Sequence, residues 1–181
     1  MNQTFDYRTL IDRIYPEGDA ARGILLSHSH SVAQLACRIN QEHRLGLDPE
    51  MVETAAMVHD IGIIRVNAPA IACFGDLPYI FHGIAGADIL RAAGADEIYA
   101  RVAERHTGAG LTPEEAIEAG LPANRSYMPE SELEKLICYA DCFYSKTHLE
   151  RKKTPQQVRA SIAKFGPNVS ARFAELEKIF G

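Results

Sequence analysis

The sequence predicts an all-helical protein with a single domain. Apolar residues recur mainly three and four positions apart, in segments bounded by Gly and Pro. Strict alternation of apolar and polar residues, which a half-buried strand would need, is hard to find over five or more positions. The 181 residues are 46% hydrophobic, enough for one well-buried core, and no long polar linker divides them.

The helices follow in order from this spacing and from the residues at their ends. Pro49, Pro113 and Pro155 stand near helix starts, where a missing N–H costs nothing, and Gly94 and Gly108 stand near stops. The domain is expected to have its core at about residues 20–146, with C-terminal helices of 155–180 packed on it. The expected helices cover about 4–15, 18–45, 49–60, 80–93, 96–107, 113–119, 131–146, 155–164 and 168–180.

One segment, GIIRVNAPAIACFGDLPY at residues 62–79, interrupts the helical pattern. It contains two prolines and two glycines and lies between two expected helices. Irregular connections of this length are uncommon inside a compact domain and are often functional. We therefore expect either a functional loop or a packed surface loop.

Charge and hydropathy exclude several classes of protein. The net charge is −5 at pH 7, and without a basic excess we expect no nucleic-acid partner. The basic residues Lys146 and 151–153 are interpreted as a solvated helix boundary. The chain has no run of 18 apolar residues and no signal-like start, so we expect no membrane association and a cytoplasmic location.

The four cysteines form no CxxC pair. In a reducing compartment they are expected to be small core residues rather than disulfide partners. Cys138 and Cys142 could share a helix face as half of a zinc site, although no second half is evident.

Two histidines in the stretch LLSHSHSVAQLA, residues 25–36, differ in helical register. His28 lies three after Leu25 and four before Val32, on the apolar stripe. His30 projects from a mostly polar face and is expected to be exposed. A single histidine on an apolar stripe is usually a core residue satisfied by a backbone carbonyl, so His28 needs partners before it can be interpreted as a ligand.

Two aspartates provide such partners. Asp60 follows a hydrophobic helix in AAMVHDIGI, with no basic residue before Arg65. Asp141 lies four after Ile137 and three before Tyr144, inside an apolar face. A buried carboxylate costs several kcal/mol unless it is paired, hydrogen-bonded or bound to a metal. Both acids therefore require a partner that the local sequence does not provide.

Other histidines follow the same pattern. His106 continues the spacing of an apolar face, and His82 opens a helix with an apolar side. His43 also falls on the stripe of His28, but we set it aside because it lies at the expected frayed end of that helix. In a chain with one core, one shared metal explains these buried ionisable groups more economically than separate partners would.

The order of these residues resembles that of the HD-domain superfamily of metal-dependent phosphohydrolases, over about residues 20–146. In that family the first histidine stands four before a Val-Ala pair, which here is Val32-Ala33 and selects His28. The stretches ERHTGAGLT and LEKLICYAD look like those of the symmetrical diadenosine tetraphosphate hydrolase branch, and still more like small stand-alone HDIG proteins. The ordered residues are His28, His59-Asp60 in HDIG, His82, His106 and Asp141.

The resemblance implies an HD-type helical bundle with one or two metal ions. His28, His59, Asp60 and Asp141 would bind the first metal, and Asp60 would bridge to a second metal. His82 and His106 would complete that second site, while His59 and Asp60 would be the catalytic pair. Mixed imidazole and carboxylate ligation suits Fe, Mn, Co, Ni or Zn, or Mg, better than Ca.

The sequence also departs from the family pattern. It has no GYP motif and no second histidine beside His106, which argues against a cyclic-di-GMP phosphodiesterase. The lysine often found after HDIG is replaced by Ile63. Arg65, Arg105 and Lys146 are the candidates to contact substrate in its place.

These residues predict a hydrolase acting on a phosphate ester or anhydride. Two carboxylates and four neutral imidazoles bring −2 to two divalent ions, which leaves a net positive site for a phosphate. The expected substrate is a nucleotide or another small phosphorylated compound. The alternative is a module that uses the metal to sense a nucleotide or anion without turnover.

Overall fold

The computed structural model describes residues 5–181, and within them the fold is helical. The nine α-helices are α1 (Tyr7–Ile14), α2 (Ala20–Glu42), α3 (Pro49–Val58), α4 (His82–Ala92), α5 (Glu97–Arg105), α6 (Pro113–Glu118), α7 (Glu132–Asp141), α8 (Pro155–Ala163) and α9 (Pro167–Phe180). Short 3₁₀ helices are η1 (Ile61–Arg65), η2 (Pro69–Ile71) and η3 (Tyr79–Phe81). The only strands among the described residues are β1 (Asn67–Ala68) and β2 (Cys73–Phe74), which pair antiparallel.

Side chains at the helix starts fix several of these boundaries. Asp48 caps α3 and Asp96 caps α5, each accepting a backbone N–H of the first turn. Thr112 and Thr154 form capping boxes with Glu115 and Gln157 ahead of a proline at the first helical position.

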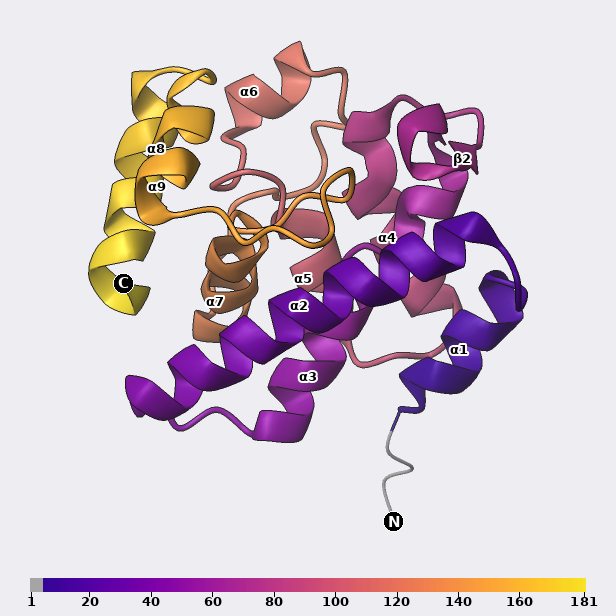
Figure 1. Ribbon diagram of the computed structural model, residues 1–181. Coiled ribbons are helices and arrows are strands. Elements are labelled where there is room, and N and C mark those ends of the chain that lie inside the picture. Colours follow the sequence, from indigo (N-terminus) through magenta and orange to yellow (C-terminus); the bar gives the residue numbers. More distant parts are fainter. Residues whose placement is uncertain (1–4) are drawn as a thin grey trace.

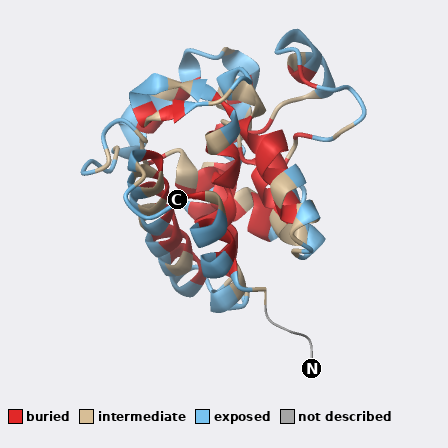
Figure 2. Ribbon diagram, turned by 90° about the vertical axis from the view of Figure 1, so that its right-hand side faces the viewer, coloured by how far each residue is buried: buried red, intermediate tan, exposed pale blue. Residues whose placement is uncertain are grey.

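The long helix α2 crosses the front of the molecule and packs on α3 and α7 (Figure 1). Helix α4 packs on α5 and on η1, which brings the end of the α3 segment against the start of α4. Buried residues gather where these helices meet, and the outer faces are exposed (Figure 2). The interior of the domain is therefore shared by α2, α3, α4, α5 and α7.

The C-terminal helices add to the same core. Tyr139 of α7 stacks on Phe173 of α9, with ring centroids 5.6 Å apart, and lies 5.7 Å from the ring of Phe180. Arg172 of α9 donates to the carbonyl of Gly110 and pairs with Glu115, so α9 also holds the segment that precedes α6.

The all-helical, single-domain fold expected from the sequence is confirmed. Helix boundaries agree to within three residues except at one end, and residue 4, the expected start of the first helix, lies outside the described residues. The helix expected over 131–146 ends at Asp141, because the chain then tightens through i+3 hydrogen bonds such as Tyr144 N–H to Asp141 C=O. None of the described helices is long and apolar enough to cross a membrane.

Residues 62–79 form a compact structure rather than an extended loop. They contain most of η1, all of η2 and the β1–β2 hairpin, in which Asn67 pairs with Phe74, and they end where η3 begins. Gly62 lies so close to α4 that an added Cβ would fall 2.1 Å from the carbonyl oxygen of His82 and 2.3 Å from the nitrogen of Gly86. Only glycine permits this approach, so the last residue of HDIG sets the distance between η1 and α4.

Candidate metal centre

Helix ends place most of the expected ligands. His59 and His106 are the C-caps of α3 and α5, and His82 is the first residue of α4. Asp141 is the last residue of α7, and Asp60 lies in the turn after α3. His28 alone comes from the middle of a helix, α2. Helix ends can change direction within a residue or two, which lets side chains from four elements converge on the same point.

Backbone carbonyls orient three of the imidazoles. The Nδ1 atoms of His59, His82 and His106 each lie 2.6 to 2.8 Å from the carbonyl oxygen three residues earlier. Those oxygens belong to Ala56, Tyr79 and Ala103. Ala56 and Ala103 lie in the last turns of α3 and α5, where carbonyls lack an intrahelical partner, whereas the Tyr79 carbonyl also accepts the backbone N–H of His82. An N–H at Nδ1 satisfies the carbonyl and leaves the lone pair on Nε2, as metal-binding histidines require.

The first group joins four residues: His28, His59, Asp60 and Asp141. One ligand atom from each lies within 4.8 Å of the others. His28 Nε2 is 2.8 Å from Asp141 Oδ1 and 3.1 Å from Asp60 Oδ2. His59 Nε2 is 3.1 Å from the same Asp60 oxygen.

The second group joins Asp60, His82 and His106 through the other carboxylate oxygen. Oδ1 of Asp60 is 3.5 Å from His82 Nε2 and 3.3 Å from His106 Nε2. The two Nε2 atoms lie 3.0 Å apart. Because both rings commit their Nδ1–H to a carbonyl, both Nε2 atoms bring a lone pair to this contact, which is repulsive without a cation between them.

These two groups fit divalent metal ions. Asp60 and His59 are fully buried, and neither the two Asp60 oxygens nor His59 Nε2 has a hydrogen-bond partner among the described residues. Orphaned buried polar atoms are costly, and a metal ion would satisfy all three of them. Imidazole nitrogen with carboxylate oxygen is the donor set of Mn, Fe, Co, Ni and Zn sites.

Electrostatics keep both acids charged. Burial raises the pKa of Asp60, but Lys146 and His59 outweigh burial and hold that pKa well below its usual range. Burial likewise opposes ionisation of Asp141, but the hydrogen bond with His28 and the nearby imidazole of His59, 3.4 Å away, hold its pKa well below the usual range. Both carboxylates are therefore available as anionic ligands at neutral pH.

The histidines differ in their protonation. Burial, with the neighbouring His106, lowers the pKa of His82 to about 3, so this imidazole is neutral. Burial also opposes the charged form of His59, yet Asp60 and Asp141 outweigh it and raise the pKa to about 10. A metal bound at His59 must therefore displace a proton.

Lys146 is the only one of the three expected substrate contacts that reaches this cluster. Its Nζ lies 2.7 Å from Asp60 Oδ2 and donates to the hydroxyl of Tyr79 at 3.1 Å. Arg65 is exposed on η1 and forms no ion pair with any described residue. Arg105 is buried and pairs with Glu134 and Glu130, each at 3.0 Å, which ties the end of α5 to the start of α7.

A pocket of about 360 Å³ opens beside the cluster. Part of its lining is apolar and aromatic, with Ala68, Ile71 and Tyr79, and part is cationic and hydroxylated. Asp141 lies in its lining, so the pocket reaches the first group of ligands. The cationic and hydroxylated residues are Ser145, Lys146, Thr147 and Lys153, and Tyr144 also lines the pocket.

The sequence did not predict Tyr79, Lys153 or the hydroxyl groups of this pocket. Tyr79 stacks on His82 with centroids 4.7 Å apart, and its position three before that histidine in a Pro-bounded turn is the one sequence signal for it. Lys153 belongs to the basic cluster that was interpreted as a solvated boundary. Cys138 and Cys142, the suggested half of a zinc site, both donate to the carbonyl of Gly108, and all four cysteines are free thiols.

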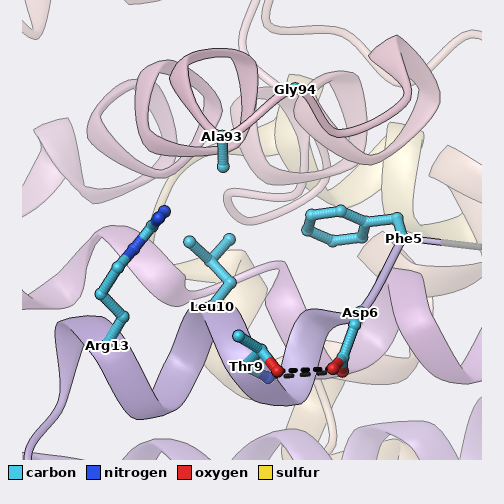
Figure 3. Close-up of a pocket in the computed structure, with 7 residues that line it drawn as sticks. All are labelled: Phe5, Asp6, Thr9, Leu10, Arg13, Ala93 and Gly94. Atoms are coloured by element: carbon cyan, nitrogen blue, oxygen red, sulfur yellow. Dashed lines mark hydrogen bonds between the residues drawn. The ribbon is translucent and has the colours of Figure 1, made fainter. Parts of the chain in front are cut away.

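A second hollow of about 360 Å³ lies between α1 and the end of α4 (Figure 3). Its lining includes Phe5, Thr9 and Arg13 on one side and Ala93 and Gly94 on the other. None of the expected metal ligands lines this hollow. Of the two hollows, only the pocket beside Asp141 therefore adjoins the candidate metal centre.

The match to a protein-family model covers the whole ligand set. The HD domain model matches residues 25–145, which begin before His28 and end after Asp141. The chain belongs to the HD domain family. Its fold is also similar to the HD domain of the L. monocytogenes phosphodiesterase PgpH, with a TM-score of 0.52, 15% identity and 93% coverage of both chains.

Several curated proteins are similar to this HD domain in sequence. A tRNA (cytidine(56)-2'-O)-methyltransferase of Thermoplasma volcanium is 32% identical over 174 residues, 96% of this chain and 46% of that protein. An uncharacterized protein of Methanocaldococcus jannaschii is 44% identical over 95 residues, 52% of this chain and 49% of that protein. The chain thus spans about half the length of these relatives.

Proposed function

We propose that this HD domain is a metal-dependent phosphohydrolase that acts on a small phosphorylated compound. The observation that carries the proposal is the convergence of four imidazole nitrogens and two charged carboxylates beside a pocket with a lysine-lined wall. Membership of the HD domain family supports the same chemistry. A bound divalent ion would supply a water of lowered pKa and stabilise charge on the phosphate oxygens.

The chain's own residues would divide the remaining work. Asp60, with one oxygen toward each histidine group, holds the two groups in a fixed relation. Lys146 and Lys153 bring positive charge to the pocket wall, where they can bind phosphate oxygens. Tyr79, a residue that is 43% exposed, lines the pocket with an aromatic ring on which a flat group of the substrate can pack.

A nucleotide is the substrate that these walls suit best. The apolar and aromatic wall can take a base or sugar, while the cationic wall takes phosphate. Among nucleotides, diadenosine tetraphosphate is the compound to assay first, because of the sequence resemblance to its symmetrical hydrolases. The product expected from that substrate is ADP.

The tRNA methyltransferase name of one relative does not lead us to propose methyl transfer. That relative is more than twice as long as the matched region, so the printed activity belongs to a larger protein. The net charge of −5 also disfavours a nucleic-acid substrate for this chain.

The test is metal analysis followed by turnover. The purified chain is expected to retain a transition metal and, loaded with Mn, Fe or Co, to release product from a nucleotide or a chromogenic phosphodiester. Asp60→Asn and His59→Ala should abolish turnover, because the first alters the ligand that both groups share and the second removes a ligand of the first group. No metal, together with no effect of either substitution on any phosphate substrate, would refute the proposal. Tight nucleotide binding with unchanged ligand after long incubation would instead favour the sensing module.

A further inference from the structure

The segment between α7 and α8, residues 142–154, carries an excess of positive charge, although Lys146 pairs with Asp60 and Arg151 lies 3.7 Å from Glu150. It contains Lys146, Arg151, Lys152 and Lys153 but only one acid, Glu150. Figure 1 shows this orange segment looping back beside α2 rather than running directly to α8. The charge therefore lies next to the pocket and not on the far side of the molecule.

Several cations elsewhere in the described chain are paired with carboxylates. Arg91 pairs with Glu97 and Glu104, and Arg159 pairs with Glu177. Lys152 and Lys153, in contrast, form no ion pair with any carboxylate among residues 5–181. Lys153 Nζ reaches only the carbonyl of Cys142, at 3.4 Å.

The surroundings of Lys152 add to this imbalance. Its ammonium lies 5.4 Å from the ring centroid of Phe143. Burial and then the nearby charge of Arg38 lower its pKa, and the more weakly acting carboxylate of Glu42 offsets this only in part. A concave surface with unbalanced charge of one sign attracts ligands of the opposite sign.

This basic segment lines a third pocket, which lies next to the pocket beside Asp141. This third pocket, of about 780 Å³, has His148, Arg151, Lys152 and Gln157 in its lining, with Glu150 as its single acid. Ser145 and Lys153 line both this third pocket and the pocket beside Asp141, so these two pockets are adjacent. A ligand that places one phosphate beside Asp141 can therefore extend further phosphates past Lys153 toward Arg151 and Lys152.

We infer that residues 145–153 form a second phosphate subsite, so that the substrate of this site carries a chain of phosphates rather than one. The inference rests on the proposed function for the position of the scissile phosphate. It replaces the interpretation of these residues as a solvated helix boundary. A polyanion as long as a nucleic acid is disfavoured, because the basic residues are confined to one short segment of a chain with net charge −5.

The experiment compares a ligand with two phosphonate groups and a ligand with one. Methylenediphosphonate and methylphosphonate both resist hydrolysis, so their binding to the metal-loaded chain can be measured by calorimetry whether or not the chain is an enzyme. The test variant is Arg151→Gln/Lys152→Gln, since both residues are exposed, and glutamine keeps part of the stem of Lys152 beside Phe143. The control is Arg13→Gln/Lys164→Gln, which removes the same charge from two exposed residues that form no ion pair with a described residue.

We expect wild type to bind the diphosphonate about tenfold or more tightly than the monophosphonate, because the second phosphonate group gains a charged hydrogen bond that the monophosphonate lacks. The test variant should lose most of that preference while its affinity for methylphosphonate is unchanged, and the control should keep the preference. Equal binding of the two ligands by wild type would overturn the inference. An equal loss of affinity for both ligands in the test variant would also overturn it. The same holds if the test variant loses affinity only for a short RNA oligonucleotide, measured in the same way.

Failure of the proposed function has a different signature. A chain that holds no metal and hydrolyses no phosphate would fail in metal analysis and turnover. Its preference for the diphosphonate, and the loss of that preference on substitution at residues 151 and 152, would still report the subsite.

Discussion

The hydroxyl of Tyr15 holds the turn that follows Asp60, and removing it is the sharpest test of how this site is supported. Tyr15 is fully buried. Its hydroxyl donates to the carbonyl of Ile61 at 2.8 Å and accepts the N–H of Ile64 at 3.0 Å. Both partners belong to η1, which continues directly from Asp60.

The substitution Tyr15→Phe keeps the ring and removes both hydrogen bonds. The Ile61 carbonyl and the Ile64 N–H, an i, i+3 pair within η1, then each lose one hydrogen bond, and such a bond contributes about 0.5–1.5 kcal/mol. We expect a total near 2 kcal/mol, which for a domain of this size lowers Tm by about 4–8 °C. Differential scanning calorimetry and urea unfolding of the metal-free chain measure the change directly.

The matched control is Tyr144→Phe, because no described residue forms a hydrogen bond with the Tyr144 hydroxyl. This variant should unfold within about 0.5 kcal/mol of wild type, as most changes away from specific contacts do. If Tyr15→Phe were equally harmless, the two backbone groups would have found other partners, and the role given to Tyr15 in holding η1 would be wrong.

Four further outcomes follow from the same structure. His28→Ala should lower the bound metal measured by elemental analysis, whereas His30→Ala, exposed on the same helix, should leave it unchanged; equal metal in both variants would contradict the ligand assignment. Gly62→Ala should destabilise the chain and weaken metal binding in calorimetry, because its Cβ would displace the backbone of α4 at His82; full stability would refute that contact. Arg105→Met should cost about 3–5 kcal/mol in urea unfolding, because it leaves Glu134 buried without its partner; a neutral result would show that water replaces the arginine. Adding metal at about 100 times its Kd should stabilise the chelator-treated chain by about 2.7 kcal/mol, seen as a higher Tm, and no shift would argue against a folded-state site.

The sequence predicted the helices because helix formation is governed by local spacing. The 3- and 4-residue recurrence of apolar side chains, together with prolines such as Pro49 and Pro155, placed nearly every boundary within three residues. The exception, the end of α7, lies where the chain leaves the helix to bring Lys146 over Asp60. That contact joins residues 86 positions apart and leaves no local signal.

The candidate ligands were also accessible from the sequence, for a different physical reason. An acid on an apolar helix face, such as Asp60 or Asp141, is a conflict that can be seen without coordinates, because a buried charge requires a partner. The conflict identifies the acids that need a partner, and the order of the histidines around them identifies which histidines are expected to share a metal with those acids.

Tertiary structure alone decided how these residues are used. It paired Arg105 with Glu134 and left Arg65 exposed and apart from the cluster, while Lys146 came to Asp60. It also placed Lys153 between two pockets. A charged side chain on a flexible stem contacts whatever the packing of distant elements brings within reach, so its partner is a property of the fold. The need of Asp60 and Asp141 for a partner could be predicted earlier, because the apolar pattern of the helices that carry these acids already indicated that they are buried.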